Sequence, residues 1–150
     1  MSLQVIRDFM TAFGDRDFET MARLYTNDIQ YFDPLFGYLK NEEVIHMWKL
    51  RYGTEAEFGF EVGEITDFGD GYYTAAYVVS WHFGKRNKPV VQKMKAHIRV
   101  IDGRIPEHSD AFSVHDWCTQ CFGLSGKLLG WNRFYQQAVK NKIRRQLIGK

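Results

Sequence analysis

The dipeptide Asp102-Gly103 constrains the fold more than any other local feature, because it separates two predicted strands. Asp-Gly is a strong signal for a two-residue turn, which places its flanking strands side by side and antiparallel. These strands are predicted at 90–101 and 105–114. A second pair, Asp70-Gly71, precedes an aromatic and β-branched segment at 72–83. The second half of the chain is therefore predicted to form an antiparallel sheet.

The first half of the chain carries helical patterns. Apolar residues recur at helical spacing from Leu3 to Phe13, Asp17 is a suitable N-cap for a second helix, and a third is predicted between Asn41 and Gly53. Helices followed by antiparallel strands predict an α+β fold with the helices packed on one face of the sheet. Such a sheet tends to curve, which leaves a cavity between its concave face and the helices.

The C-terminal segment returns to a helical pattern. Tyr135, Val139 and Ile143 recur every four residues, and Leu147 continues this apolar stripe. We expect one domain over residues 1–150, with a core at about 3–114 and a helical extension at 115–150.

The composition is that of a folded protein. Hydrophobic residues make up 45% and aromatic residues 16% of the chain, enough to offset the entropy lost on folding and to wall a pocket. Arg7 and Asp8 interrupt the N-terminal apolar pattern, so no signal peptide is expected. No apolar stretch approaches the ~20 residues of a membrane span. We expect a cytoplasmic protein with no membrane partner.

The end of the chain is basic. It holds no acidic residue, and its cations are Lys140, Lys142, Arg144, Arg145 and Lys150. Such a segment can bind nucleic acid or anionic lipid. Its apolar stripe more simply docks on the body of the protein, and no basic patch covers a whole face, so we expect no nucleic-acid partner.

Cys118 and Cys121 form a CxxC motif, with His115 three residues earlier. A zinc site needs three or four converging ligands and a redox site needs a βαβ context, and the sequence offers neither. No glycine-rich nucleotide-binding motif is present. We therefore expect ordinary buried thiols, no metal and no cofactor.

Two stretches carry a family resemblance. The first runs from Phe9 through Asp17-Phe-Glu-Thr-Met-Ala-Arg-Leu-Tyr25 to Tyr31-Phe-Asp-Pro34, and the second is the return hairpin at 102–112. Together they resemble the ketosteroid isomerases and SnoaL-like polyketide cyclases of the NTF2-like superfamily. The resemblance covers residues 3–114 and implies a cone-shaped pocket formed by a curved antiparallel sheet and N-terminal helices. The segment 124–131 looks like the extra helical tail of a SnoaL-like subgroup.

The resemblance assigns roles to individual positions. Asp33 stands where the isomerases place their catalytic base, whereas Phe9 and Ala96 stand where they place oxyanion-stabilising donors. Because Phe and Ala donate no side-chain hydrogen bond, steroid isomerisation is not expected. SnoaL-like cyclases place an acid–base aspartate in the strand that holds Asp110, which makes Asp110 a catalytic candidate.

His108 and Asp110 are two residues apart on a predicted strand, so their side chains share a face that Phe112 continues. An imidazole beside a carboxylate in an apolar cavity is a plausible proton-transfer pair. The alternative is a hydrogen-bonded pair that merely fills the pocket. Asp33 has an alternative too, because Asp before Pro commonly accepts backbone hydrogen bonds in a turn.

Aromatic residues supply the predicted ligand-binding walls. Following the resemblance, Tyr25, Tyr31 and Trp48 are the best candidates, with Phe9 and Phe112 as further apolar walls. The aromatics of the long strand 72–83 are assigned instead to the core or to a dimer interface. The outward residues of this strand are expected to be too large to remain uncovered, which favours a homodimer.

Two functions follow. The first is a cofactor-free acid–base enzyme that isomerises, cyclises or dehydrates a small apolar, carbonyl-bearing molecule, with Asp110 or Asp33 as base and His108 as partner. The alternative is a non-catalytic ligand-binding or homodimerisation module. The sequence itself does not decide between catalysis and binding.

Overall fold

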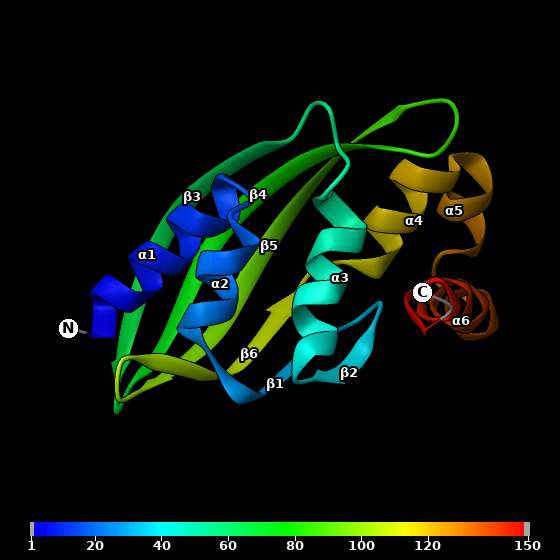
Figure 1. The fold of residues 1–150 in the computed structure, drawn as a ribbon. Coiled ribbons are helices and arrows are strands. Elements are labelled where there is room, and N and C mark those ends of the chain that lie inside the picture. The colour runs from blue at the N-terminus through cyan, green and yellow to red at the C-terminus, as the bar shows by residue number, and fades with distance from the viewer. Residues whose placement is uncertain (1, 149–150) are drawn as a thin grey trace.

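The chain folds into a curved sheet covered on its concave face by helices (Figure 1). The computed structural model describes residues 2–148. Along the chain, the elements are α1 (Ser2–Gly14), α2 (Phe18–Leu24), β1 (Tyr25–Asp33), β2 (Gly37–Lys40), α3 (Glu42–Tyr52), β3 (Gly59–Gly69), β4 (Tyr72–Phe83), β5 (Lys88–Ile101), β6 (Arg104–Ala111), α4 (Val114–Phe122), α5 (Leu124–Leu129) and α6 (Arg133–Ile148).

The six strands form one unclosed sheet in the order β2-β1-β6-β5-β4-β3. The predicted α+β class, the curved sheet, the N-terminal helices and the helical tail are all confirmed. One pairing differs from the expected antiparallel pattern, since β1 runs parallel to β6. In this pairing Tyr31 lies opposite His108 and Phe32 opposite Ser109.

Both Asp-Gly pairs form the turns predicted for them. Asp102 and Gly103 have φ angles of 52° and 76°, and Asp70 and Gly71 have 56° and 81°. Positive φ at both central residues matches the right-handed twist of the flanking strands, which favours the antiparallel β3–β4 and β5–β6 hairpins.

Most of the large side chains of β4 lie on one face. Tyr73, Tyr77, Trp81 and Phe83 pack in or against the core, and Trp81 and Phe83 also line a cavity. The outward face carries mostly small or polar residues between Tyr72 and His82. The expected crowding of this outer face is therefore wrong. The reason is that successive side chains of a strand point to opposite faces, and in β4 the odd-numbered residues point to the concave side.

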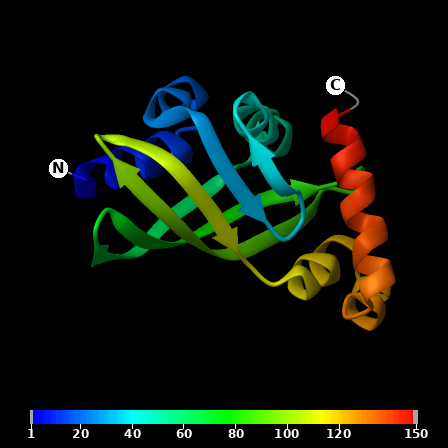
Figure 2. The same ribbon diagram turned by 90° about the horizontal axis from the view of Figure 1, so that it is seen from below.

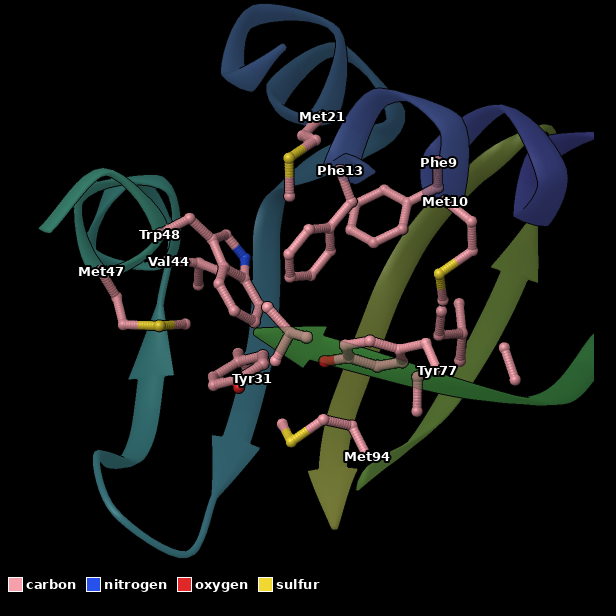
Figure 3. Packing of buried hydrophobic residues seen from close by; sticks show 14 of the residues in the cluster. Phe9, Met10, Phe13, Met21, Tyr31, Val44, Met47, Trp48, Tyr77 and Met94 are labelled. Carbon is pink, nitrogen blue, oxygen red and sulfur yellow. The ribbon is translucent and has the colours of Figure 1, made fainter. Parts of the chain in front are cut away.

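Apolar side chains from the three N-terminal helices fill the space above the sheet (Figure 3). Phe13 of α1 packs against Phe9 of the same helix, Trp48 of α3 and Tyr77 of β4, and the ring centroids of Phe13 and Trp48 lie 4.7 Å apart. The concave side is therefore densely packed beneath these helices.

The C-terminal helices gather at the end of the sheet far from the N-terminus (Figure 2). The stripe Tyr135, Val139 and Ile143 packs against the core, as predicted. Arg144 Nη1 also donates to the carbonyl of Phe36, between β1 and β2. The side chain of Leu147, and all of Lys150, lie outside the described residues.

Candidate functional site

β1 and β6 bring the three predicted catalytic residues into one hydrogen-bonded cluster. Because β1 pairs with β6 in parallel, Tyr31 and Asp33 lie beside His108 and Asp110 on the concave face. Asp33, His108 and Asp110 are all buried. We call the connected group the polar network; its members are Tyr25, Tyr31, Asp33, Trp48, Arg51, His108 and Asp110.

Asp33 accepts hydrogen bonds from four groups. Its Oδ1 accepts from the backbone N–H groups of Leu35 and Phe36, both at 2.7 Å. Its Oδ2 accepts from the Tyr31 hydroxyl at 2.7 Å and from Arg51 Nη1 at 3.2 Å. Asp33 is therefore a turn residue and also the anchor of an ion pair. The bonds from Leu35 and Phe36 are the turn contacts that the alternative interpretation of Asp33 predicted.

The Tyr31 hydroxyl joins the two carboxylates. It lies 2.7 Å from Asp33 Oδ2 and 2.9 Å from Asp110 Oδ2. A phenol has one proton to donate, so it cannot satisfy two ionised acceptors at once. Burial, and then the charges of Asp110 and Asp33, raise the pKa of Tyr31 well above its ordinary value, so the hydroxyl keeps its proton. Asp33 Oδ2 and Asp110 Oδ2 therefore compete for the single phenolic proton of Tyr31.

The remaining bonds give His108 a defined tautomer. Trp48 Nε1 donates to the Tyr25 hydroxyl at 3.2 Å, and that hydroxyl lies 2.8 Å from His108 Nδ1. Because indole only donates, Tyr25 is left to donate to Nδ1. Nε2 then carries the hydrogen and donates to Asp110 Oδ1 at 3.0 Å. With this tautomer, an unbroken series of hydrogen bonds joins Trp48 to Asp33.

Aromatic rings enclose His108. Phe9 and Tyr31 meet it edge-on, at centroid distances of 5.5 and 5.1 Å, and Trp48 stacks on it at 6.1 Å. Four of the five predicted ligand-binding residues, Phe9, Tyr25, Tyr31 and Trp48, are buried in this way. The structure brings them together around the imidazole. The fifth, Phe112, is half-buried beside Arg51.

A cavity lined by Arg51 of the polar network lies beneath the C-terminal helices and has a volume of about 290 Å³. We call it the tail cavity. Its walls come from the β1–β2 loop, α3, β4, α4 and α6, and include Phe36, Arg51, Trp81, Phe83, Trp117 and Phe122. Arg51 lines the tail cavity. Among residues 2–148, Asp33, His108 and Asp110 do not line it. Arg51 therefore connects this cavity to the network.

Arg51 was missed by the sequence analysis. It occurs three residues after Trp48 in α3, on the face that packs inward, and its side chain is only 7% exposed. A basic residue at i+3 from a buried tryptophan is the signal that could have identified it. Two tyrosines were also missed as buried polar groups. The hydroxyls of Tyr52 and Tyr77 are buried and have no hydrogen-bond partner among the residues described.

The CxxC segment forms part of the packing of α4. Cys118 and Cys121 are buried, and burial raises the pKa of both thiols, that of Cys121 to about 12. His115 stacks on Trp131, with ring centroids 4.0 Å apart. Among residues 2–148, no group of three His, Cys, Asp or Glu side chains is arranged to hold a metal ion.

Comparison with known proteins gives a family and a set of similar folds. The model of the SnoaL-like domain matches residues 6–108. No curated protein matches the chain. None of the helices described is long and apolar enough to cross a membrane.

Three solved structures share the fold at low sequence identity. A protein of ketosteroid isomerase-like fold from Catenulispora acidiphila, in complex with trimethylamine, has a TM-score of 0.67 and 21% identity, over 82% of this chain and 95% of that one. An LEH-like epoxide hydrolase of M. tuberculosis has a TM-score of 0.67 and 19% identity, over 85% of this chain and 92% of that one. IdmH of Streptomyces antibioticus, a proposed polyketide cyclase, gives 0.65 and 20%, over 75% and 91%.

Proposed function

Because this chain belongs to the SnoaL-like domain family, we propose that it is a cofactor-independent acid–base enzyme acting on a small apolar molecule that bears a carbonyl group. One observation carries the proposal: a single hydroxyl, that of Tyr31, bridges two buried carboxylates. Sharing one proton among three oxygens is a common way to keep one acid and one base in the same site.

The proposed roles follow the order in which the residues of the polar network are hydrogen-bonded. Asp33 acts as the base on the cavity side, because its partner Arg51 lines the tail cavity. Tyr31 passes a proton between Asp33 and Asp110, and His108 holds Asp110 in position through its Nε2. The substrate occupies the tail cavity and reaches Asp33 past Arg51, because proton transfer needs a distance of about 3 Å or one bridging water.

Isomerisation of an enone, aldol-type cyclisation and dehydration of a β-hydroxy carbonyl compound can each begin by removing a proton next to the carbonyl. The test therefore measures this step directly, as deuterium exchange at the α-carbon of 2-tetralone in D₂O by NMR. We expect the protein to accelerate exchange, and Asp33→Asn and Asp110→Asn each to reduce it by about 10²–10⁴-fold. Lys93→Gln, an exposed residue on the convex face, is the matched control. An unaccelerated exchange in the wild type would reject this mechanism.

A second function, homodimerisation through the sheet, is favoured by a different observation. Four large apolar residues are exposed around a groove of about 610 Å³ on the convex face: Phe32, Tyr38, Phe68 and Tyr72. Exposed apolar patches of this kind commonly mark association surfaces. Analytical ultracentrifugation of the wild type and of Phe68→Lys tests it. A wild-type monomer at micromolar concentration is incompatible with this second function.

A further inference from the structure

The tail cavity has the size and walls of a site for a small aromatic ligand. Its volume of about 290 Å³ is near the lower end of the range of about 300–1,000 Å³ found for small-molecule sites. Four aromatic residues on one side contact each other edge-on, with centroid distances between 5.5 and 5.9 Å; they are Trp81, Phe83, Trp117 and Phe122. Such walls fit a flat ligand of one or two rings.

Arg51 presents an unused hydrogen-bond donor at this cavity. Nη1 is engaged by Asp33 Oδ2 at 3.2 Å and by Met47 Sδ at 3.8 Å. Nη2 is buried and has no partner among residues 2–148. Buried polar atoms are rarely left unpaired, so each such atom requires an explanation. A ligand that accepts from Nη2 would supply the missing bond.

The pairing of Arg51 with Asp33 leaves room for a second anion. Asp33 contacts the guanidinium through one oxygen only, while its other oxygen is held by the backbone of Leu35 and Phe36. The planar guanidinium carries five N–H groups in a fork that matches a carboxylate. Arg51 therefore retains donors for a second acceptor on the cavity side.

A second cation lies in the lining of the cavity. Lys142 has no carboxylate partner among residues 2–148, whereas Arg51 is paired with Asp33, and the one carboxylate of the lining, Glu55, already accepts from the backbone N–H of His82. The C-terminal helices that cover it contain no acidic residue after Asp116. A cation at a cleft raises the local concentration of anions.

We propose that the tail cavity binds a small aromatic carboxylate, held by Arg51 through its free Nη2 and stacked among the four aromatic walls. This inference rests on the proposed function, since it names the substrate class of the same site. It requires that the carboxylate lie on the Arg51 side of the cavity, with the ring toward α4.

Binding is measured with 2-naphthoate and with its neutral analogue 2-acetylnaphthalene by isothermal titration calorimetry. We expect 2-naphthoate to bind at least about tenfold more tightly, because only its carboxylate makes a charge-assisted bond to Arg51. Arg51→Met should reduce the affinity for 2-naphthoate by about tenfold or more and leave 2-acetylnaphthalene nearly unchanged. Arg99→Met, the same change on the convex face, should alter neither affinity.

A second variant keeps the test valid if Arg51→Met fails to fold. The double variant Arg51→Met with Asp33→Asn removes both charges of the buried pair, and it should show the same loss for 2-naphthoate. Equal affinity for the two probes, retained affinity in the double variant, or no binding of 2-naphthoate would each overturn the inference. Because binding and α-carbon exchange are separate readouts, tight binding without exchange rejects the enzyme proposal alone.

Discussion

The two ends of the concave space differ in packing, since one end is filled and the other contains a cavity. Beneath α1 and α3, the polar network lies among tightly packed rings, and its hydrogen bonds form one unbroken series from Trp48 to Asp33. Beneath the C-terminal helices, a cavity of about 290 Å³ remains, and Arg51 leaves a buried donor unpaired there. The same arginine belongs to both ends.

This difference shows where the chain can accept change. A satisfied network is costly to disturb, because a removed partner leaves a buried polar group unpaired. A cavity with an unpaired donor can gain a ligand without breaking an existing bond. Stability is therefore expected to depend on the network end, and binding on the tail end.

The largest expected effect is the difference in unfolding free energy between Asp33→Asn and Asp110→Asn. Asp33→Asn turns an acceptor of Arg51 into a donor and leaves a buried guanidinium uncompensated, so it should cost about 3–5 kcal/mol of unfolding free energy. Asp110→Asn should cost less than about 1 kcal/mol. Its amide can accept from His108 through oxygen and donate to Tyr31 through nitrogen, which leaves the Tyr31 proton for Asp33.

Urea unfolding measures the loss of unfolding free energy in each of the two variants. Equal losses would show that Asp110 is ionised and structural in the same sense as Asp33. An unfolded Asp110→Asn variant would make Asp110 a structural anchor, and the enzyme proposal would lose one of its two acid–base residues.

An intermediate effect is expected at the tail end from Gly126→Val. A Cβ at Gly126 would lie 1.9 Å from the backbone oxygen of Cys118, so α5 must move away from α4. We expect a loss of about 1–3 kcal/mol, as for an overpacked core site. In Gly126→Val, a disulfide reagent should label the buried thiols of Cys118 and Cys121 faster than in the wild type. In Asp33→Asn, the labelling rate in native buffer should stay closer to that of the wild type.

The labelling experiment sharpens the comparison because it separates local opening from global unfolding. Gly84→Ala serves as the control glycine, since a Cβ there would contact nothing within 4 Å, although its φ of 72° adds some strain. If the thiols of Gly126→Val were labelled no faster than those of the wild type, the tail end would not open by itself, and the two ends would unfold together.

The smallest effect concerns Tyr52 at neutral pH. Its buried hydroxyl has no partner among the described residues, so Tyr52→Phe should cost less than about 1 kcal/mol at pH 7. Burial raises the pKa of Tyr52 to about 12. A raised tyrosine pKa stabilises the protein fully below the unfolded pKa of about 10, and this contribution is lost as the pH rises toward 12.

Each such tyrosine should lower the unfolding free energy by about 1.4 kcal/mol per pH unit between pH 10 and 12. Tyr52→Phe should therefore reduce the slope of the wild-type curve by this amount, measured by urea unfolding at several pH values. Identical slopes for the two proteins would mean that Tyr52 is hydrated in solution.

Local sequence determined much of the framework. The two Asp-Gly pairs specify their turns because few other residues adopt positive φ at both positions. Alternation in β5 places Met94 and Ala96 inward and Lys93 and Lys95 outward, and the same period puts His108 and Asp110 on one face. Asp33 before Pro34 formed the turn expected of it. These features depend on neighbours a few residues apart.

Only the tertiary structure decided how these pieces meet. The parallel pairing of β1 with β6 brings Tyr31 to Asp110 across 79 positions of sequence, and no local pattern encodes that pairing. Arg51 reaches Asp33 because of the way α3 packs over β1. The predicted pocket beside His108 is filled by Phe9, Tyr31 and Trp48, and the cavity lies further along under α6. Hydrophobic periodicity tells which residues face inward, whereas whether their volumes fill the interior depends on the packing of all elements at once.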